Sequence, residues 1–129
     1  MVNEKIFLDA NILLDVLFDR ANHSVARDYI LKNDGILHIS ALTAHLVTHF
    51  GLKILELNVL NQYLADYYIE DLTAQDVEWA FTNARCKDFE NALQLAVAIR
   101  SGCTTFATLD KALFNTYKDL PTIKVVLLK

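Results

Sequence analysis

Residues that interrupt or link folded segments are scarce in this chain. Its 129 residues include one proline and three glycines, which is too few for the flexible or extended linkers that separate domains. The chain is 53% hydrophobic, and its length is sufficient to bury one compact core. We therefore expect residues 1–129 to form a single domain.

Long apolar runs and a cysteine framework are also missing. No segment approaches the roughly 18 uninterrupted apolar residues of a membrane span, and the first residues, MVNEK, lack the order of a secretory leader. We expect a soluble, cytoplasmic protein with no membrane partner. Cys86 and Cys103 are too few for a disulfide scaffold or a zinc knuckle, so we expect free thiols.

Positive charge is the third shortage. The chain has 12 lysines and arginines against 16 aspartates and glutamates, a formal net charge of −4. This balance argues against nucleic-acid binding through a broad basic surface. A nuclease with a local metal site is still compatible with it, because such a site needs carboxylates at its centre and few basic residues at its rim.

The chain does contain a regular alternation of short apolar runs and amphipathic segments. The apolar runs predict strands at residues 5–8, 36–40, 68–72, 103–109 and 123–128. Helical spacing predicts helices at residues 11–19, 25–33, 43–53, 56–67, 88–100 and 111–118, with another beginning at Thr73. This alternation implies an α/β fold with a mostly parallel sheet of about five strands covered on both faces.

Two of the predicted strands end in aspartate. Asp9 follows the run at residues 5–8, and Asp110 follows the run at residues 103–109. Ligands and catalytic groups collect at the carboxyl ends of parallel strands. If the two strands are neighbours, the two carboxylates meet there and offer oxygen ligands suited to Mg²⁺ or Mn²⁺. Alternatively, each aspartate simply caps the helix that follows it.

Four segments carry a family resemblance: FLDANILLD at 7–15, ISALTAHL at 39–46, KDFENALQLAVA at 87–98 and FATLD at 106–110. In this order they resemble the signature segments of the PIN-domain nucleases, including the VapC-type toxins. The resemblance implies a PIN-like three-layer α/β/α sandwich. It also implies a ribonuclease that uses Mg²⁺ or Mn²⁺ at an acidic cluster, a homodimer, and a small antitoxin protein as partner.

The family's acidic positions carry over residue by residue. Asp9 and Asp110 match the first and fourth positions, and Asn11 matches a polar residue that supports the first. The second position is usually Glu and is His45 here, and the third is usually Asp and is Asn91. Each lost carboxylate removes a charge that offsets cation desolvation, which predicts weaker metal binding. Asn91 can still offer a carbonyl oxygen, and His45 a ring nitrogen.

Asp88 and the pair His45 and His49 have two interpretations each, and Asp15 is secondary. Asp88 lies three residues before Asn91, so it is either another metal ligand on the same helix face or, more simply, the helix N-cap. His45 and His49 have the spacing of a two-histidine zinc pair, but the glutamate of a zincin motif is missing, so a solvated pair is the simpler interpretation. Asp15 should face away from Asp9.

Aromatic side chains are candidates for stacking on RNA bases. Core packing or a dimer surface explains them equally well, and the apolar faces of the helices at 43–53 and 56–67 are a plausible dimer interface. The residues concerned are Tyr63, Tyr67, Tyr68 and Trp79.

Two functional hypotheses follow from the resemblance. The first is a metal-dependent endoribonuclease of the toxin-antitoxin type, in which Asp9 and Asp110 hold Mg²⁺ or Mn²⁺ with help from Asn91, His45 or Asp88. The second is a catalytically impaired PIN module kept for RNA or protein binding.

Overall fold

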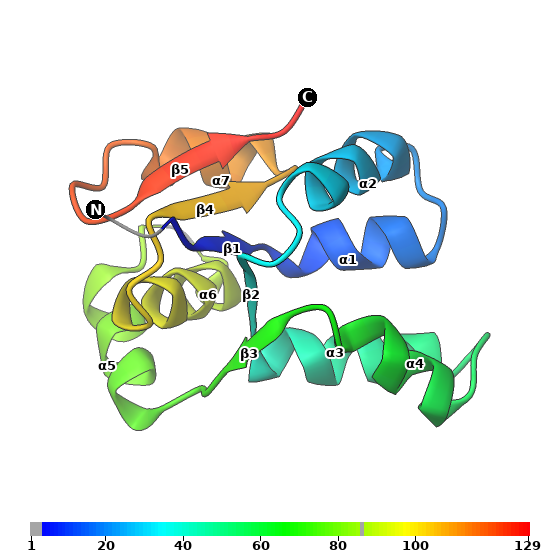
Figure 1. The fold of residues 1–129 in the computed structure, drawn as a ribbon. Coiled ribbons are helices and arrows are strands. Elements are labelled where there is room, and N and C mark those ends of the chain that lie inside the picture. Colours follow the sequence, from blue (N-terminus) through cyan, green and yellow to red (C-terminus); the bar gives the residue numbers. More distant parts are fainter. Residues whose placement is uncertain (1–3, 86) are drawn as a thin grey trace.

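The computed structural model describes residues 4–85 and 87–129. Within these ranges, five strands and seven helices alternate along the chain (Figure 1). The strands are β1 (Ile6–Leu8), β2 (Leu37–Ser40), β3 (Tyr68–Glu70), β4 (Thr105–Thr108) and β5 (Lys124–Leu127). The helices are α1 (Ala10–Leu17), α2 (His23–Lys32), α3 (Ala41–Gly51), α4 (Leu57–Leu64), α5 (Ala74–Asn83), α6 (Phe89–Arg100) and α7 (Lys111–Tyr117).

The five strands form one parallel sheet in the order β3-β2-β1-β4-β5. This confirms the predicted parallel sheet and places β1 and β4, the two strands followed by aspartate, side by side. Every residue of β1, β2 and β4 is buried. Because helices cover both faces of a parallel sheet, its central strands are buried on both sides.

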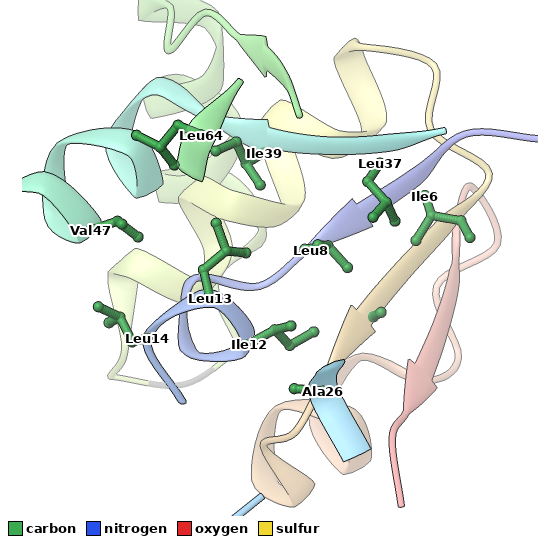
Figure 2. Packing of buried hydrophobic residues seen from close by; sticks show 11 residues of the cluster. Ile6, Leu8, Ile12, Leu13, Leu14, Ala26, Leu37, Ile39, Val47 and Leu64 are labelled. Atoms are coloured by element: carbon green, nitrogen blue, oxygen red, sulfur yellow. The ribbon is translucent and has the colours of Figure 1, made fainter. Parts of the chain in front are cut away.

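Two apolar clusters lie on opposite faces of the sheet. Ile6 and Leu8 of β1 pack against α1, α2 and α3 in the first cluster (Figure 2). Phe7 points to the other face, where it stacks on Phe106 with ring centroids 5.5 Å apart and packs with α6 and α7. Side chains alternate between the two faces of a strand, so Asp9, two residues after Phe7, faces the same layer as Phe7, which contains α6.

The helix α5 begins at the predicted capping box. The Thr73 hydroxyl accepts from the Asp76 backbone N–H, and the Asp76 carboxylate accepts from that of Thr73. Arg100 at the end of α6 donates to the same carboxylate over 2.9 Å. Burial alone would raise the pKa of Asp76, but the hydrogen bonds from Arg100 and Thr73 outweigh it and lower the pKa below 3.8. Asp76 therefore ties the start of α5 to the end of α6.

The predicted element boundaries differ from the structure at several ends. The helix expected at 43–53 begins at Ala41, directly after Ser40, and ends at Gly51. The helix expected at 56–67 is shorter, Leu57–Leu64, and the strand expected from 103 starts only at Thr105. Helix termini depend on which side chain supplies the cap, and here the Ser40 side chain accepts from the Thr43 N–H.

The aromatic candidates for RNA stacking divide into packed and exposed groups. Tyr63 and Tyr67 pack against the first core cluster, and the Tyr63 hydroxyl donates to the Leu13 carbonyl. Trp79 packs against the second cluster, whereas Tyr68 is exposed and stacks on His38. Core packing is therefore the confirmed interpretation of the first three.

The thiol of Cys103 is free and buried, as expected, and burial raises its pKa to about 12, so it stays protonated. Cys86 lies outside the described residues. None of the described helices combines the length and apolar character that crossing a membrane requires.

Candidate metal site at the carboxyl edge of the sheet

Three polar side chains form a row at the carboxyl edge of the sheet. Leu8 pairs with Ala107 of β4, and Phe7 pairs with His38 of β2. Continuing the β1–β4 register by one residue places Asp9 beside Thr108, and continuing the β1–β2 register by two residues places Asp9 beside Ser40. Asp9 therefore lies between Thr108 and Ser40. Paired residues of neighbouring parallel strands point to the same face, so all three side chains face the layer that contains α6.

Asp9 lies at the centre of this row and is only 3% exposed. The Thr108 hydroxyl donates to its Oδ2 over 2.8 Å. Asp9 occupies the N-cap position of α1, but within the described residues its side chain does not make the N-cap hydrogen bond, so helix capping does not explain this aspartate. A buried carboxylate held by a hydroxyl is a candidate ligand rather than a structural cap.

The surroundings of Asp9 disfavour its negative charge. Burial raises the pKa of Asp9 to about 6, against the lowering effect of hydrogen bonds from the Thr108 hydroxyl and the Ala10 backbone. The negative charges of Asp110 and Glu90 add to the increase. Mutual repulsion of carboxylates is typical of sites that a cation would stabilise.

Asp110 lies at the end of β4 and caps α7. Its Oδ1 accepts from the Leu113 N–H over 3.1 Å, and its own N–H donates to the Thr108 hydroxyl over 3.0 Å. The capping interpretation is thus confirmed for Asp110. Thr108 connects the two aspartates, because its hydroxyl donates to Asp9 and accepts from the backbone of Asp110.

The first turn of α6 supplies the remaining groups at this edge. Asp88 is the N-cap and accepts from the Asn91 N–H over 3.3 Å, which confirms the simpler of its two interpretations, while its role as a metal ligand remains a prediction. Asn91 is half-buried in the same turn.

Glu90 is the acidic residue that sequence comparison missed. Its charge acts on Asp9, while partial burial and the charge of Asp88 raise its own pKa. Glu90 is visible in the segment KDFENAL, directly before Asn91.

His45 lies on the exposed side of α3, next to His49, with ring centroids 5.9 Å apart. In the part of the chain that the structure describes, neither a hydrogen bond nor a charge effect from His45 on Asp9 is found. The structure brings Asp9, Asp110 and Glu90 into one electrostatic environment, and it leaves His45 outside it. A catalytic role for His45 is thus supported only by its sequence position.

The donor chemistry of the edge fits a hard divalent cation. Asp9, Asp110 and Glu90 offer carboxylate oxygens, and Asn91 adds an amide oxygen, which are the ligand types that Mg²⁺ and Mn²⁺ prefer. Over residues 4–85 and 87–129, however, no three acidic, histidine or cysteine side chains stand close enough together to enclose an ion. Glu90 is much more exposed than Asp9, so its side chain is less tightly held.

Asp9→Asn should stabilise the metal-free protein at pH 7. The folded-state pKa of Asp9, about 6, lies above its ordinary value of 3.8, so ionisation of Asp9 costs stability as pH rises through this window. Asparagine keeps an acceptor for Thr108 without the charge, and the expected gain is on the order of 2 kcal/mol. Urea unfolding in the presence of chelator should show a higher free energy of unfolding for Asp9→Asn than for the wild-type protein at pH 7, and this difference should disappear near pH 4. An equal or lower stability of the variant at pH 7 would contradict the electrostatic account.

Comparison with known protein families identifies the family of this chain. The family model of the PIN domain matches residues 6–119, nearly the whole chain. The chain belongs to the PIN-domain family. The three-layer fold of this PIN domain confirms the prediction from the sequence.

Solved structures show the same fold. A toxin-antitoxin complex from Klebsiella pneumoniae is 20% identical, with a TM-score of 0.75, over 95% of this chain and 96% of that one. DNA-bound VapBC from Salmonella typhimurium is 15% identical, with a TM-score of 0.69, over 96% and 98%. A sarcin-ricin loop cleaving VapC toxin from Mycobacterium tuberculosis is 15% identical, with a TM-score of 0.68, over 86% and 94%. The comparison with curated proteins gave no match.

Proposed function

We propose that this PIN domain is a divalent-metal-dependent endoribonuclease of the toxin-antitoxin type, acting on RNA phosphodiesters. The observation that carries the proposal is the buried Asp9 carboxylate, which Thr108 holds at the sheet edge within range of two further carboxylates. Membership of the PIN family supports it. A similar fold in a toxin described as cleaving the sarcin-ricin loop supports the choice of RNA.

The proposed roles of the residues follow from their positions. Asp9 and Asp110 would hold Mg²⁺ or Mn²⁺, and Glu90, Asp88 and Asn91 would supply further oxygens from the first turn of α6. A bound cation would polarise the phosphodiester and offset its negative charge. Thr108 fixes the orientation of the Asp9 carboxylate through its 2.8 Å hydrogen bond. His45 would act from α3 as a neutral replacement for the family's second acid.

The alternative is a PIN module with impaired catalysis that binds RNA or protein. Two observations favour it: Asn91 and His45 replace two family acids, and no closed group of three metal-binding side chains exists within the described residues. The two functions differ in metal affinity, since a binding module does not need a cation at Asp9.

An antitoxin partner, a homodimer and a cytoplasmic location are part of the same proposal. The Klebsiella and Salmonella structures are described as a toxin-antitoxin complex and as VapBC. Large apolar side chains are exposed at and beside the connection between α3 and α4, which supports a protein contact there. They are Leu52, Ile54, Leu57 and Val59.

Metal removal is the test of the proposed activity. Protein stripped with a chelator should leave structured RNA intact, and added Mn²⁺ or Mg²⁺ should restore cleavage, because the proposed mechanism uses the cation to polarise the phosphodiester. Gel analysis of labelled RNA measures both states, with Asp9→Asn protein purified in parallel to detect contaminating nuclease. Cleavage that persists in chelator would contradict the metal-dependent mechanism, and intact RNA under every metal condition would favour the binding module.

A further inference from the structure

Gln94 makes a polar bridge inside an otherwise apolar interface. It lies in the middle of α6, is 1% exposed, and is followed by the buried residues Leu95 to Ala98. The Ser40 hydroxyl donates to its Oε1 over 2.8 Å, and its Nε2 donates to the Thr43 hydroxyl over 3.0 Å. Both ends of the carboxamide are therefore bound by side chains more than 50 residues earlier in the chain.

The partners of Gln94 lie where β2 becomes α3. Ser40 is the last residue of β2 and the N-cap of α3, and its hydroxyl oxygen accepts from the Thr43 N–H over 3.0 Å. Ser40 is also the neighbour of Asp9 in the row at the sheet edge, by continuation of the β1–β2 register. The bridge thus fastens α6 to the sheet one strand away from Asp9.

The same face of α6 carries Glu90, whose charge acts on Asp9. Glu90 and Asn91 precede Gln94 by four and three residues, so they lie one turn nearer the helix start on the same face. A rotation of α6 about its axis would move these side chains together with Gln94. Apolar contacts tolerate such repacking, whereas two directional hydrogen bonds to one carboxamide are satisfied in one orientation only.

We propose that Gln94 is a positioning residue, which sets the orientation of α6 so that Glu90 and Asn91 stand beside Asp9. The inference rests on the proposed metal-dependent function and assigns a role in it to a residue outside the family's acidic positions. A buried apolar side chain of similar size would avoid the desolvation of an amide. The polar bridge therefore carries the desolvation cost of the amide, but it defines a single orientation of α6.

Gln94→Met tests the bridge, because it keeps the length of the side chain and removes both hydrogen bonds. Thr43→Val is a second variant that removes the acceptor of Gln94 and leaves the Ser40 cap in place. Leu95→Met is the matched control, a change of shape at the next buried residue of α6. Residual dipolar couplings of the α6 amides measure the angle between α6 and the sheet without metal, and calorimetry measures Mn²⁺ affinity of the folded proteins.

The proposal expects altered α6 couplings in Gln94→Met and Thr43→Val, with Mn²⁺ binding weakened about 10- to 100-fold, as for the loss of groups that orient metal ligands. Leu95→Met should change neither. Unchanged couplings in both bridge variants would overturn the proposal, as would altered couplings with wild-type Mn²⁺ affinity. If the wild-type protein binds no Mn²⁺, the proposed function fails, and the couplings alone then decide whether Gln94 orients α6.

Discussion

Asp9→Asn should abolish Mn²⁺ binding and RNA cleavage while the protein stays folded. Asp9 is the buried carboxylate at the centre of the edge, where it accepts a hydrogen bond from Thr108. The asparagine side chain of the variant keeps an acceptor for this hydrogen bond but loses the charge. Loss of a group that only orients a metal ligand costs about 10- to 100-fold in affinity, so loss of the ligand should cost at least about 100-fold. Calorimetry and a gel-based cleavage assay measure the two effects.

Asp15→Asn is the matched control for that variant. Asp15 is also a buried aspartate, 8% exposed, but it lies within α1 and pairs with Arg20 at 3.4 Å. The same chemical change there should leave Mn²⁺ affinity and cleavage near wild type. Cleavage by Asp9→Asn at the wild-type rate would show that the activity comes from another site or another protein.

The double variant His45→Glu with Asn91→Asp should increase Mn²⁺ affinity by about 10-fold or more, which corresponds to about 1.4 kcal/mol. Both substitutions introduce the acidic residues that the family resemblance leads us to expect at these two positions. The gain should come mainly from Asn91→Asp, because position 91 is half-buried in the first turn of α6 and attraction at short range in a partly buried site is worth more than this. A glutamate at position 45 has to reach the cation from the exposed side of α3. Calorimetric titration beside the wild-type protein measures the gain.

His49→Glu is the control for added charge, since it places a carboxylate one turn further along the exposed side of α3. It should leave the affinity nearly unchanged, because a distant exposed charge is screened by salt. A double variant with wild-type affinity would mean that carboxylates at positions 45 and 91 do not reach a cation at Asp9, and this would favour the impaired module.

The positions of Asp9 and Asp110 could be predicted from the sequence because each follows a short buried strand. That pattern fixes the end of the sheet but not the use of each carboxylate. Asp110 caps its helix, whereas the side chain of Asp9, in the same kind of position, accepts a hydrogen bond from the Thr108 hydroxyl instead. The difference depends on strand register between segments 99 residues apart, which local patterns do not contain.

Glu90 and Gln94 were missed for a different reason. The family resemblance assigns a role to Asn91, whereas the charge that acts on Asp9 belongs to Glu90, one residue earlier. Gln94 interrupts an apolar helix face, which is a visible signal, but its partners Ser40 and Thr43 are defined only once α6 packs against the end of β2. Both roles depend on the orientation of one helix over the sheet.

Calorimetric titration of the metal-stripped wild-type protein with Mn²⁺ tests the central claim most directly. The claim is that the carboxyl edge around Asp9 holds a divalent cation although two family acids are replaced. We predict saturable binding that is lost in Asp9→Asn. A folded wild-type protein that binds no Mn²⁺ would contradict the metal-dependent nuclease and leave a PIN module that binds RNA or protein without a cation.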